Sequence, residues 1–593
     1  MRVHGKNQVL FGGGKEMIDY SAMCKDLQNN GEIPNWFTTA GTQLFYEKYS
    51  YNNETVKSRF ESVAAAMAQH APRVYPSWWN EDSYTAGKTW QEAFFAVLWD
   101  GFVSCSTPML ANAGIRSRGT TVSCAGGYVG NNLYDRYNAI TEAAVLTKHS
   151  HGTSYSIDHW PAEGDKLKRG GRSLGVMPIV RDFIAAMEEV TQGSRRGSLA
   201  YSIRPQHGDF EKVLKHLYER TESNNVGWLI DDDFNRKMDE EDPETEEKFG
   251  KMLGVKMPRG KGYYTFISKM NRHLAEAFKR KGMTVKASNL CQETCLPSDE
   301  NYTFSCVILN YNLELWDSWP EHLVFIGQVM ADCNISEYLA TMDEMTPMDK
   351  QAMRKIYRFT KEFRSLGSGV LGWHTLMQMK RISVSSLDCM FLNNKIFKHL
   401  DSESLKATQW LAGVLGEPLG CEGLGIRNAT RLMMPPTKST AEIMAGASEG
   451  VGLDTAMAFT KQSAGGEFFR VNKVLVGWIK EKGLDFDSCV REVINNKGSV
   501  QKVTWLDEVE KAALRTGFEV PMEDYLRLCS QRQKYIDQAQ SINLYFTSND
   551  SEEYIGKMHK LAFKDEGILS LYYIYSMRGA GDISRIDFCE MCQ

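Results

Sequence analysis

The sequence predicts an α/β protein with a helical N-terminal domain, and two observations support this fold class. Through most of the first hundred residues, apolar side chains recur at three- and four-residue spacing, as on one face of an α-helix. Farther along, short strand-like runs stand among longer helical patterns. We therefore expect a helical domain over residues 1–104 and a domain of mixed helices and strands over 105–575.

The expected elements follow in chain order. In the first domain the helical pattern begins near Trp36 and covers 43–49, 56–67 and 90–98. Beyond it we expect a turn-rich segment over 106–114, a strand over 119–124, and helices over 133–148, 179–190, 321–342 and 350–363. A strand-like run with adjacent tyrosines covers 567–576, and we expect the last residues, 576–593, to form a flexible polar tail.

Composition and charge narrow the function classes. The chain has 593 residues, 42% hydrophobic and 24% charged, as in a globular enzyme with a large core. A net charge of −5 gives no basic surface for nucleic acid, and no apolar run approaches the roughly 18 residues that span a membrane. Because no signal peptide is visible, we expect a cytoplasmic protein whose 13 cysteines are buried, metal-binding or redox-active.

One stretch, 287–294, carries three reactive groups at alternate positions. Asn289, Cys291 and Glu293 supply an amide, a thiol and a carboxylate. In an extended strand or strand-like loop these side chains share one side, while Leu290 and Gln292 point away. The pattern predicts one edge of a pocket. The alternative is a buried structural cysteine beside a solvated glutamate.

Two further cysteines follow short stretches rich in hydroxyl groups. Cys124 ends the predicted strand 119–124, and Cys306 ends the Thr-Phe-Ser-Cys sequence 303–306. Small hydroxyl residues beside a strand-end cysteine suit a site that a substrate approaches closely. For Cys124, a core cysteine with capping hydroxyl groups is the alternative.

Three segments have residue types that bind phosphate. Two basic, glycine-containing loops, 163–172 and 192–198, flank a helix, and arginine side chains and glycine amides both hold phosphate oxygens. Ordinary solvated loops are the alternative. In 435–442 a Pro-Pro pair is followed by three hydroxyl residues and a lysine at the start of a predicted helix. This pattern predicts an anion-binding site at the N-terminus of that helix. Helix capping alone would not require three hydroxyl groups and a lysine.

Three other features are less specific. We interpret the charged residues 232–262 as a solvated insertion without a metal. The small-residue run 367–372 lets backbone elements approach closely. The Cys-x-x-Cys at Cys589 and Cys592 suits disulfide exchange; it also has the spacing of half a zinc site, but no second half is nearby.

In this order, the motifs resemble the catalytic (large, α) subunit of class I ribonucleotide reductase, in a short form without the N-terminal ATP-binding cone. The resemblance covers nearly the whole chain, through 36–41, 123–124, 288–293, 306, 427–429, 436–440, 572–573 and the terminal cysteines. It implies a ten-stranded α/β barrel of two five-stranded halves in antiparallel arrangement, with Cys291 on a loop inside. The implied activity is the reduction of ribonucleotides, expected to be diphosphates, to 2′-deoxyribonucleotides for DNA synthesis by a thiyl-radical mechanism.

The resemblance also implies a role for each motif. Cys291 is expected to become the thiyl radical that abstracts the 3′ hydrogen of the ribose, with Glu293 as general base on the 3′-hydroxyl and Asn289 positioning the sugar. Cys124 and Cys306 are expected to form the dithiol that supplies the reducing equivalents and ends as a disulfide. The implied substrate-binding residues are Thr107, Ser123, Gly152, Pro436, Thr437, Lys438, Ser439 and Thr440.

Several partners follow from the same resemblance. Tyr572 and Tyr573 are expected to pass the radical to Cys291 from a ferritin-like small (β) subunit that holds a metal cofactor, so this chain itself binds no metal and no cofactor tightly. Cys589 and Cys592 are expected to reduce the active-site disulfide and to be reduced by thioredoxin or glutaredoxin. We expect a homodimer with a deoxynucleoside triphosphate or ATP as effector near 160–198, bound by Asn131, Lys168, Arg169, Arg195 and Arg196.

Three features depart from the family pattern. The helical domain starts almost at once, so we expect no ATP-cone activity switch. Residues 130–133 read Gly-Asn-Asn-Leu where the family's effector site usually has an aspartate. The loop 159–164 lacks the arginine usually found there for the effector phosphate, and the basic residues that follow, Lys166 among them, are candidates to compensate.

Other functions compete with this interpretation. A cobalamin-dependent (class II) reductase shares the barrel and three cysteines but has no use for the tyrosine pair. An inactive nucleotide-binding regulator has no reason to keep the three cysteines, Glu293, both tyrosines and the tail thiols together. A zinc-binding module is the weakest option, because one cysteine pair alone has ligand spacing.

Overall fold

Threonine side chains start three of the helices in the N-terminal part of the chain. Thr38, Thr55 and Thr89 each accept a hydrogen bond from a backbone N–H of the first turn, and Thr89 forms a capping box with Glu92. These elements are α1 (Tyr20–Asn29), α2 (Thr39–Leu44), a π-helix (Phe45–Tyr49), α3 (Val56–Ala68) and α4 (Trp90–Trp99). The helices expected over 43–49, 56–67 and 90–98 are therefore present. The computed structural model describes residues 18–168, 170–192, 195–219, 224–463 and 466–577.

Five parallel strands form the first half of a barrel. In spatial order they are β2 (Cys124–Tyr128), β3 (Gly152–Ser156), β6 (Leu199–Ile203), β7 (Asn224–Ile230) and β8 (Tyr263–Phe266). The helices that connect these strands are α6 (Leu133–Lys148), α7 (Met177–Glu189), α8 (Phe210–Glu219), α9 (Asp232–Asp239) and α10 (Pro243–Arg259). A short hairpin of β4 (Thr191–Gln192) and β5 (Arg195–Arg196) precedes β6.

The second half runs antiparallel to the first and closes the barrel. Its members are β9 (Phe304–Asn312), β10 (Leu366–Leu371), the segment 432–434, the segment 540–547 with β13 (Leu544–Thr547), and the segment 570–577 with β14 (Ser570–Leu571) and β15 (Ile574–Met577). Neighbours within this half are parallel. The two halves meet antiparallel at two seams, β2 against β9 and β8 against β14. The described strands thus confirm the ten-stranded α/β barrel.

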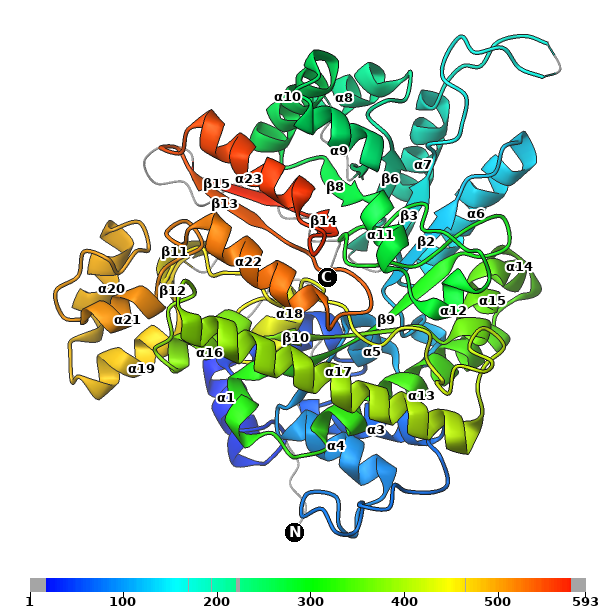
Figure 1. Ribbon diagram of the computed structural model, residues 1–593. Coiled ribbons are helices and arrows are strands. Elements are labelled where there is room, and N and C mark those ends of the chain that lie inside the picture. The colour runs from blue at the N-terminus through cyan, green and yellow to red at the C-terminus, as the bar shows by residue number, and fades with distance from the viewer. Residues whose placement is uncertain (1–17, 169, 193–194, 220–223, 464–465, 578–593) are drawn as a thin grey trace.

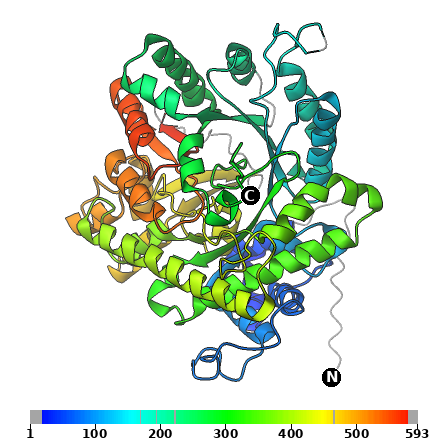
Figure 2. The same cartoon turned by 45° about the vertical axis from the view of Figure 1, so that its right-hand side comes forward.

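The remaining elements lie around this ring, as Figures 1 and 2 show from two directions. β1 (Val103–Cys105) extends the ring along the far end of β9. The helices around the second half are α13 (Leu323–Asp343), α14 (Pro347–Ala352), α15 (Arg354–Phe363), α16 (Trp373–Met379), α17 (Leu387–Leu415), α22 (Met522–Gln533) and α23 (Glu552–Lys564). Short helices are α5 (Thr107–Asn112), α11 (Ile267–His273), α12 (Glu276–Lys279) and α18 (Lys438–Ile443), with 3-10 turns at Arg116–Arg118 and Leu313–Ser318.

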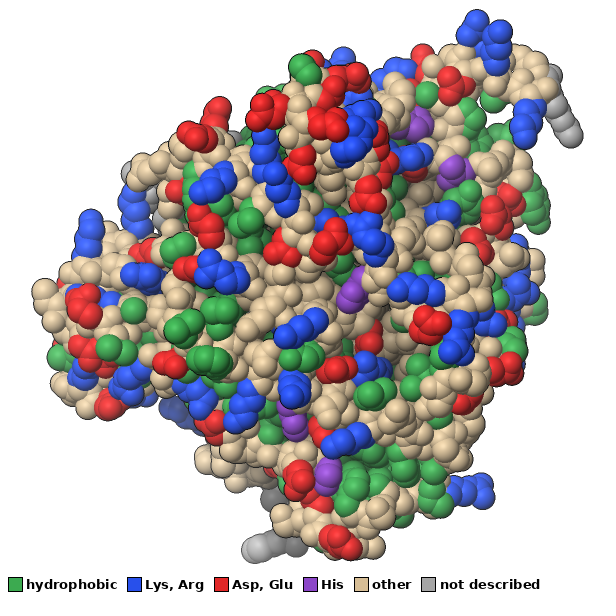
Figure 3. Space-filling view, viewed as in Figure 1, with side chains coloured by type: hydrophobic (Ala, Val, Ile, Leu, Met, Phe, Trp, Pro, Cys, Tyr) green, Lys and Arg blue, Asp and Glu red, His purple; other side chains and the backbone are tan. Residues whose placement is uncertain are grey.

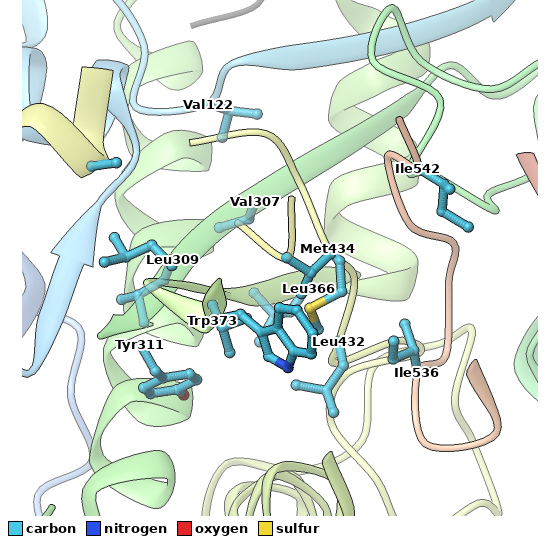
Figure 4. Packing of buried hydrophobic residues seen from close by; sticks show 14 of the residues in the cluster. Val122, Val307, Leu309, Tyr311, Leu366, Trp373, Leu432, Met434, Ile536 and Ile542 are labelled. Carbon is cyan, nitrogen blue, oxygen red and sulfur yellow. The ribbon is translucent and has the colours of Figure 1, made fainter. Parts of the chain in front are cut away.

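A small lobe on one side of the barrel has a core of its own. It contains β11 (Ala458–Ser463), β12 (Gly466–Val471), α19 (Lys473–Glu481), α20 (Phe486–Asn495) and α21 (Glu508–Ala513). Its buried residues, such as Leu475, Trp478 and Val490, form a cluster separate from the main core. The main core is continuous from the N-terminal helices into the barrel. Figure 4 shows Trp373 beside Leu432 and Met434 in that core. Within the described residues, no helix is long and apolar enough to cross a membrane.

Three expected elements differ in the structure. The segment 106–114, expected to be turn-rich, contains the helix α5, with Pro108 in its first turn where proline is well tolerated. The strand expected over 119–124 instead begins at Cys124, because pairing with β3 and β9 starts there. The strand-like run 567–576 is divided into β14 and β15, since β14 pairs with β8 and β15 with β13, and Tyr572 and Tyr573 lie at the break.

Two charged or helical segments also differ from expectation. The segment 232–262 is a pair of helices, α9 and α10, whose apolar face is buried against the barrel at residues such as Phe234 and Phe249. Its charges gather on the outer face, as Figure 3 shows over α8–α10, in ion pairs such as Arg236 with Asp233. The helix expected over 350–363 is broken at Met353 into α14 and α15.

Candidate active site

A pocket with an empty volume of about 420 Å³ opens inside the barrel. Its walls come from five parts of the chain: the start of α5, the start of β2, the loop inside the barrel, β9, and the segment that leads into α18. The lining residues are Ser106, Thr107, Ser123, Cys124, Cys291, Glu293, Ile308, Asn310, Pro435, Pro436, Thr437, Lys438, Ser439 and Thr440. The pocket thus brings together sequence motifs that are more than 300 residues apart.

The loop 287–294 crosses the interior of the barrel and is buried along its whole length. It is not extended as expected: it turns at 290–292, where Gln292 has a left-handed φ of 69°. The first half of the barrel holds the back of the turn, since Ser154 Oγ donates to Ser288 O at 2.6 Å and Thr265 Oγ1 bonds the Gln292 side chain. Cys291 and Glu293 therefore face the pocket from a turn rather than from a strand.

Glu293 lies at the centre of a hydrogen-bond network. Asn289 Nδ2 donates to Glu293 Oε1 at 2.7 Å, and Ser541 Oγ lies 3.0 Å from Glu293 Oε2 and 2.6 Å from Cys291 O. Burial raises the pKa of the Glu293 carboxyl to about 7, although the bonds from Asn289 and Ser541 oppose the rise. A carboxyl with this pKa exchanges protons readily near neutral pH, as a general base requires.

Cys124 and Cys306 face each other across the seam between β2 and β9. They are directly paired in the antiparallel register, and both are buried free thiols. Burial raises the pKa of Cys124 to about 12 and that of Cys306 well above its usual value, and the Glu293 carboxylate adds to both shifts. Asn289 Nδ2 lies 3.6 Å from Cys124 Sγ, so one amide contacts both the thiol and Glu293.

The far end of the pocket is rich in hydroxyl groups and lysines. Lys48 Nζ, from the N-terminal helical domain, donates to Ser439 Oγ at 2.7 Å, and Tyr49 OH lies 3.1 Å from Thr107 Oγ1. The Thr437 hydroxyl accepts from Gly450 N at 2.7 Å. The N-terminal helices thus hold this end of the pocket in place, with the Lys438 side chain in its wall.

A cluster of tyrosines reaches Cys291 from the second seam, between β8 and β14. Tyr572, Tyr263 and Cys291 form one buried cluster, with Tyr573 packed against it. The ring centroids of Tyr572 and Tyr573 are 3.9 Å apart, and Tyr263 lies 4.8 Å from Tyr572. The aromatic rings therefore form a continuous path to the cysteine.

Comparisons with known proteins agree with this geometry. The family model described as "Ribonucleotide reductase, barrel domain" matches residues 122–246, 240–421 and 420–574, and the model of the family's all-alpha domain matches 35–118. The chain belongs to the ribonucleotide reductase family. This membership confirms the predicted activity, the reduction of ribonucleotides to 2′-deoxyribonucleotides.

Individual relatives place the chain among the large subunits. It is 29% identical over 505 residues to a protein of Frog virus 3 (isolate Goorha) named as a ribonucleoside-diphosphate reductase large subunit, covering 81% of this chain and 86% of that protein. The large subunit of Invertebrate iridescent virus 3 is 29% identical over 336 residues, and the match spans 52% of its length. The solved Actinobacillus ureae class Id ribonucleotide reductase alpha subunit has 28% identity and a TM-score of 0.81, covering 92% of this chain and 98% of that one.

Asn289 and Cys306 do not line the pocket themselves but adjoin residues that do, since Asn289 bonds Glu293 and Cys306 faces Cys124. The other predicted site residues also lie outside the pocket wall. Gly152 begins β3 behind Leu290, where its N–H donates to Ser123 O at 2.7 Å. Asn131 and Lys168 are exposed, and the backbones of Arg195 and Arg196 form β5. Arg169, Cys589 and Cys592 lie outside the described residues. In the described part of the chain, no group of three or more His, Cys, Asp or Glu side chains is arranged to hold a metal ion.

Some residues of the reductase pocket were not predicted from the sequence. Ser106 and Asn310 are buried polar side chains of its wall, and Ser541 bonds Glu293 from the segment before β13. Ser106 adjoins Thr107, so its neighbourhood could have indicated it. Asn310 and Ser541 stand in ordinary sequence surroundings, and their positions depend on which strands become neighbours.

Proposed function

We propose that this pocket reduces a ribonucleoside diphosphate, with Cys291, Glu293, Asn289, Cys124 and Cys306 as the reacting or positioning side chains. One observation carries the proposal: a thiol, a carboxyl and one member of a facing pair of thiols line the same pocket. Ribose reduction needs all three, because it removes a hydrogen atom, moves a proton and consumes two electrons.

In the proposed reaction, the Cys291 thiyl radical takes the 3′ hydrogen atom and becomes a thiol. Glu293 accepts the proton of the 3′-hydroxyl, and the 2′-hydroxyl leaves as water with a proton from the dithiol. The second hydrogen of the dithiol goes to C2′, so Cys124 and Cys306 together give up two protons and two electrons and become a disulfide. Glu293 returns its proton to the 3′ oxygen, and Cys291 returns the hydrogen atom to C3′ and is again a radical, so atoms and electrons balance over one turnover.

We assign the diphosphate to the hydroxyl-rich end of the pocket. Thr107, Ser123 and the four residues 437–440 contribute hydroxyl donors and one ammonium group to the lining of this pocket. Charged and neutral donors of this kind bind phosphate oxygens. Pro436 shapes the backbone there, and Gly152 supports the opposite side from behind Leu290.

We further propose that the radical enters through Tyr573 and Tyr572. Membership among class I α subunits implies a separate radical-generating subunit, which we take to be a ferritin-like, metal-containing β subunit. We also propose that Cys589 and Cys592 re-reduce the disulfide and are reduced by thioredoxin or glutaredoxin. A homodimer would bind a nucleoside triphosphate effector through Asn131, Lys168, Arg169, Arg195 and Arg196.

The decisive experiment is an assay on all four ribonucleoside diphosphates with the candidate small subunit and each deoxynucleoside triphosphate in turn. We expect turnover of at least one substrate, dependent on the small subunit and on a dithiol reductant. A Cys291→Ser variant should bind nucleotide and be inactive; full activity of that variant excludes the proposed radical. Activity with adenosylcobalamin and no small subunit would instead assign the chain to class II.

A further inference from the structure

A third sulfur atom lies beside the Cys124–Cys306 pair. The Cys306 thiol donates to the thioether of Met433, with Sγ and Sδ 3.1 Å apart. Both side chains are fully buried. Cys124, Cys306 and Met433 form a small apolar cluster of their own, closed by Ile308, separate from the main core. The reducing pair therefore has a polarizable neighbour at Cys306, whereas Asn289 contacts Cys124.

The barrel is built to hold the Met433 side chain in this place. Its backbone N–H donates to Ser368 O at 3.1 Å, which fixes the segment 432–434 against β10. Gly367 of β10 leaves the space that the thioether fills, since a Cβ there would lie 2.5 Å from Met433 Sδ and 2.6 Å from its Cγ. The small-residue run noted in the sequence thus makes room for one methionine.

The next residue, Met434, serves a different purpose. Successive side chains of a strand point to opposite faces, and Met434 packs beside Trp373 in the main core (Figure 4). Met434 is as deeply buried as Met433. The two methionines therefore provide a matched pair, one against the thiols and one against the core.

We propose that Met433 is a positioning residue that stabilises the reduced form of the Cys124–Cys306 couple. The inference rests on the proposed role of these cysteines as the reducing pair. The thioether is a weak hydrogen-bond acceptor, and it finds a donor only while Cys306 carries an S–H group. When the disulfide forms, that hydrogen is gone and the contact is lost.

The contact with Met433 should stabilise the dithiol relative to the disulfide. Any contact made by the dithiol alone shifts the equilibrium toward the dithiol, so the disulfide becomes easier to reduce. Burial keeps the pKa of both thiols well above neutral, so the donor is present under working conditions. For the enzyme, the disulfide left after each turnover is then more readily re-reduced.

The test is a redox titration of the full-length chain without small subunit or substrate, with Cys589→Ser and Cys592→Ser in every sample. Mixtures of reduced and oxidised dithiothreitol set the equilibrium: the Cys124–Cys306 disulfide and reduced dithiothreitol give two thiols and oxidised dithiothreitol. Free thiols are alkylated after acid quenching, and the peptide pair linked through Cys124 and Cys306 is quantified by mass spectrometry.

We expect Met433→Leu to favour the disulfide by about three- to tenfold, which is about 14–30 mV toward lower potential for a two-electron couple. Met434→Leu is the matched control, and its Cys124–Cys306 couple should have the same midpoint potential as that of the parent chain. Gly367→Ala displaces the thioether while keeping Met433 and should shift the couple in the same direction. This second variant decides the matter if Met433→Leu does not fold.

Two results would overturn the inference, and each rules out a different part of it. Equal midpoints for the parent chain and for Met433→Leu or Gly367→Ala exclude a role for the thioether while leaving the reducing pair intact. If the parent chain forms no Cys124–Cys306 disulfide at any ratio of dithiothreitol forms, the proposed reducing pair itself is wrong.

Discussion

At the scale of single residues, Glu293 shows how burial prepares a side chain for chemistry. The carboxyl is enclosed by the barrel, and two hydrogen bonds from Asn289 and Ser541 only partly offset the cost of its charge. Its pKa of about 7 lies where a proton acceptor works best at neutral pH. The same enclosure keeps Cys124 and Cys306 as thiols, the form that donates hydrogen.

The pKa of Glu293 predicts a pH dependence of catalysis. Because the carboxylate form accepts the proton, kcat/KM should rise as pH increases through about 7 and level off above it. Glu293→Gln should lower kcat by about 10²–10⁴-fold with nucleotide binding kept. Steady-state rates from pH 6 to 8.5 test both statements, with small-subunit activity checked separately at each pH. A wild-type profile without this rise would count against Glu293 as the base.

At the scale of elements, a buried ion network joins helix α13 to the second half of the barrel. Asp332 of α13 accepts from Arg364 Nε at 2.8 Å, Arg427 Nε at 3.0 Å and Asn428 Nδ2 at 2.8 Å. Burial alone would raise the pKa of Asp332, but the two arginines lower it below its usual value. The motif 427–429 noted in the sequence is therefore structural, since it fixes the start of the segment that carries Met433 and the pocket wall.

Removing this carboxylate should destabilise the barrel. Asp332→Asn leaves the buried Arg364 and the partly buried Arg427 without their counter-charge, at a cost of about 3–5 kcal/mol. Because the folded-state pKa lies below the unfolded one, this stabilisation exists above the unfolded pKa and is lost as pH falls through the folded pKa. Urea unfolding midpoints measure the effect, with Asp232→Asn on the exposed Arg272 pair as control. Equal midpoints for the two variants would contradict the prediction.

Helix α10 contributes a buried lysine beneath the tyrosine path. Lys256 Nζ donates to Gly262 O at 2.7 Å and to Tyr572 O, and its ring neighbours are Tyr263 and Tyr264. No described carboxylate lies within ion-pair distance of it. Burial lowers the pKa of Lys256 to about 7. The lysine ties the break between β14 and β15 to α10.

The lowered pKa of Lys256 predicts how stability varies with pH. Between about pH 7 and its ordinary pKa of 10.5, the unfolded chain binds more protons at this residue than the folded one, so folding stability rises with pH. Lys256→Met should remove that slope between pH 7 and 9. Lys251→Met, on the exposed side of the same helix, should keep it. Parallel curves of unfolding free energy for the wild type and Lys256→Met would refute the assignment.

At the scale of the whole molecule, local patterns predicted more of the helices than of the site. The helix over Leu133–Lys148 has the predicted bounds, and its start is a local feature, since the Asn132 side chain caps the first turn. The strand at Cys124 was misplaced, since a Cys-Ala-Gly-Gly-Tyr sequence has little strand preference and pairs only because its neighbours are there. The barrel was predicted from the family resemblance and not from the periodicity of the sequence.

In the site, too, local sequence patterns predicted some features, while others depend on contacts between distant parts of the chain. That Asn289 and Glu293 share a side was predicted from an extended backbone, whereas a turn with Gln292 in the left-handed region produces it. The facing of Cys124 and Cys306 depends on strand pairing across 180 residues or so of chain, for which no local signal exists. Ser541 and Met433 reach the site in the same non-local manner.

The tyrosine path predicts a requirement for the whole assembly. Tyr573→Phe removes a hydroxyl that one-electron transfer needs, so turnover with the small subunit should fall below detection while nucleotide affinity is unchanged. Equilibrium binding of a ribonucleoside diphosphate and the assay with the small subunit measure the two quantities. Tyr545→Phe, in a stacked pair with Tyr575 farther along β13, is the control and should retain activity. Activity in Tyr573→Phe equal to the control would exclude this path.

The two antiparallel seams of the barrel have one more consequence. Cys124 and Cys306 belong to the seam of β2 and β9, whereas Tyr572 follows the seam of β8 and β14, and the loop bearing Cys291 lies between them. In the proposed mechanism, the radical therefore reaches Cys291 from one wall of the barrel and the reducing electrons come from the opposite wall. The closed ring allows this separation, because the two seams lie on opposite sides of it.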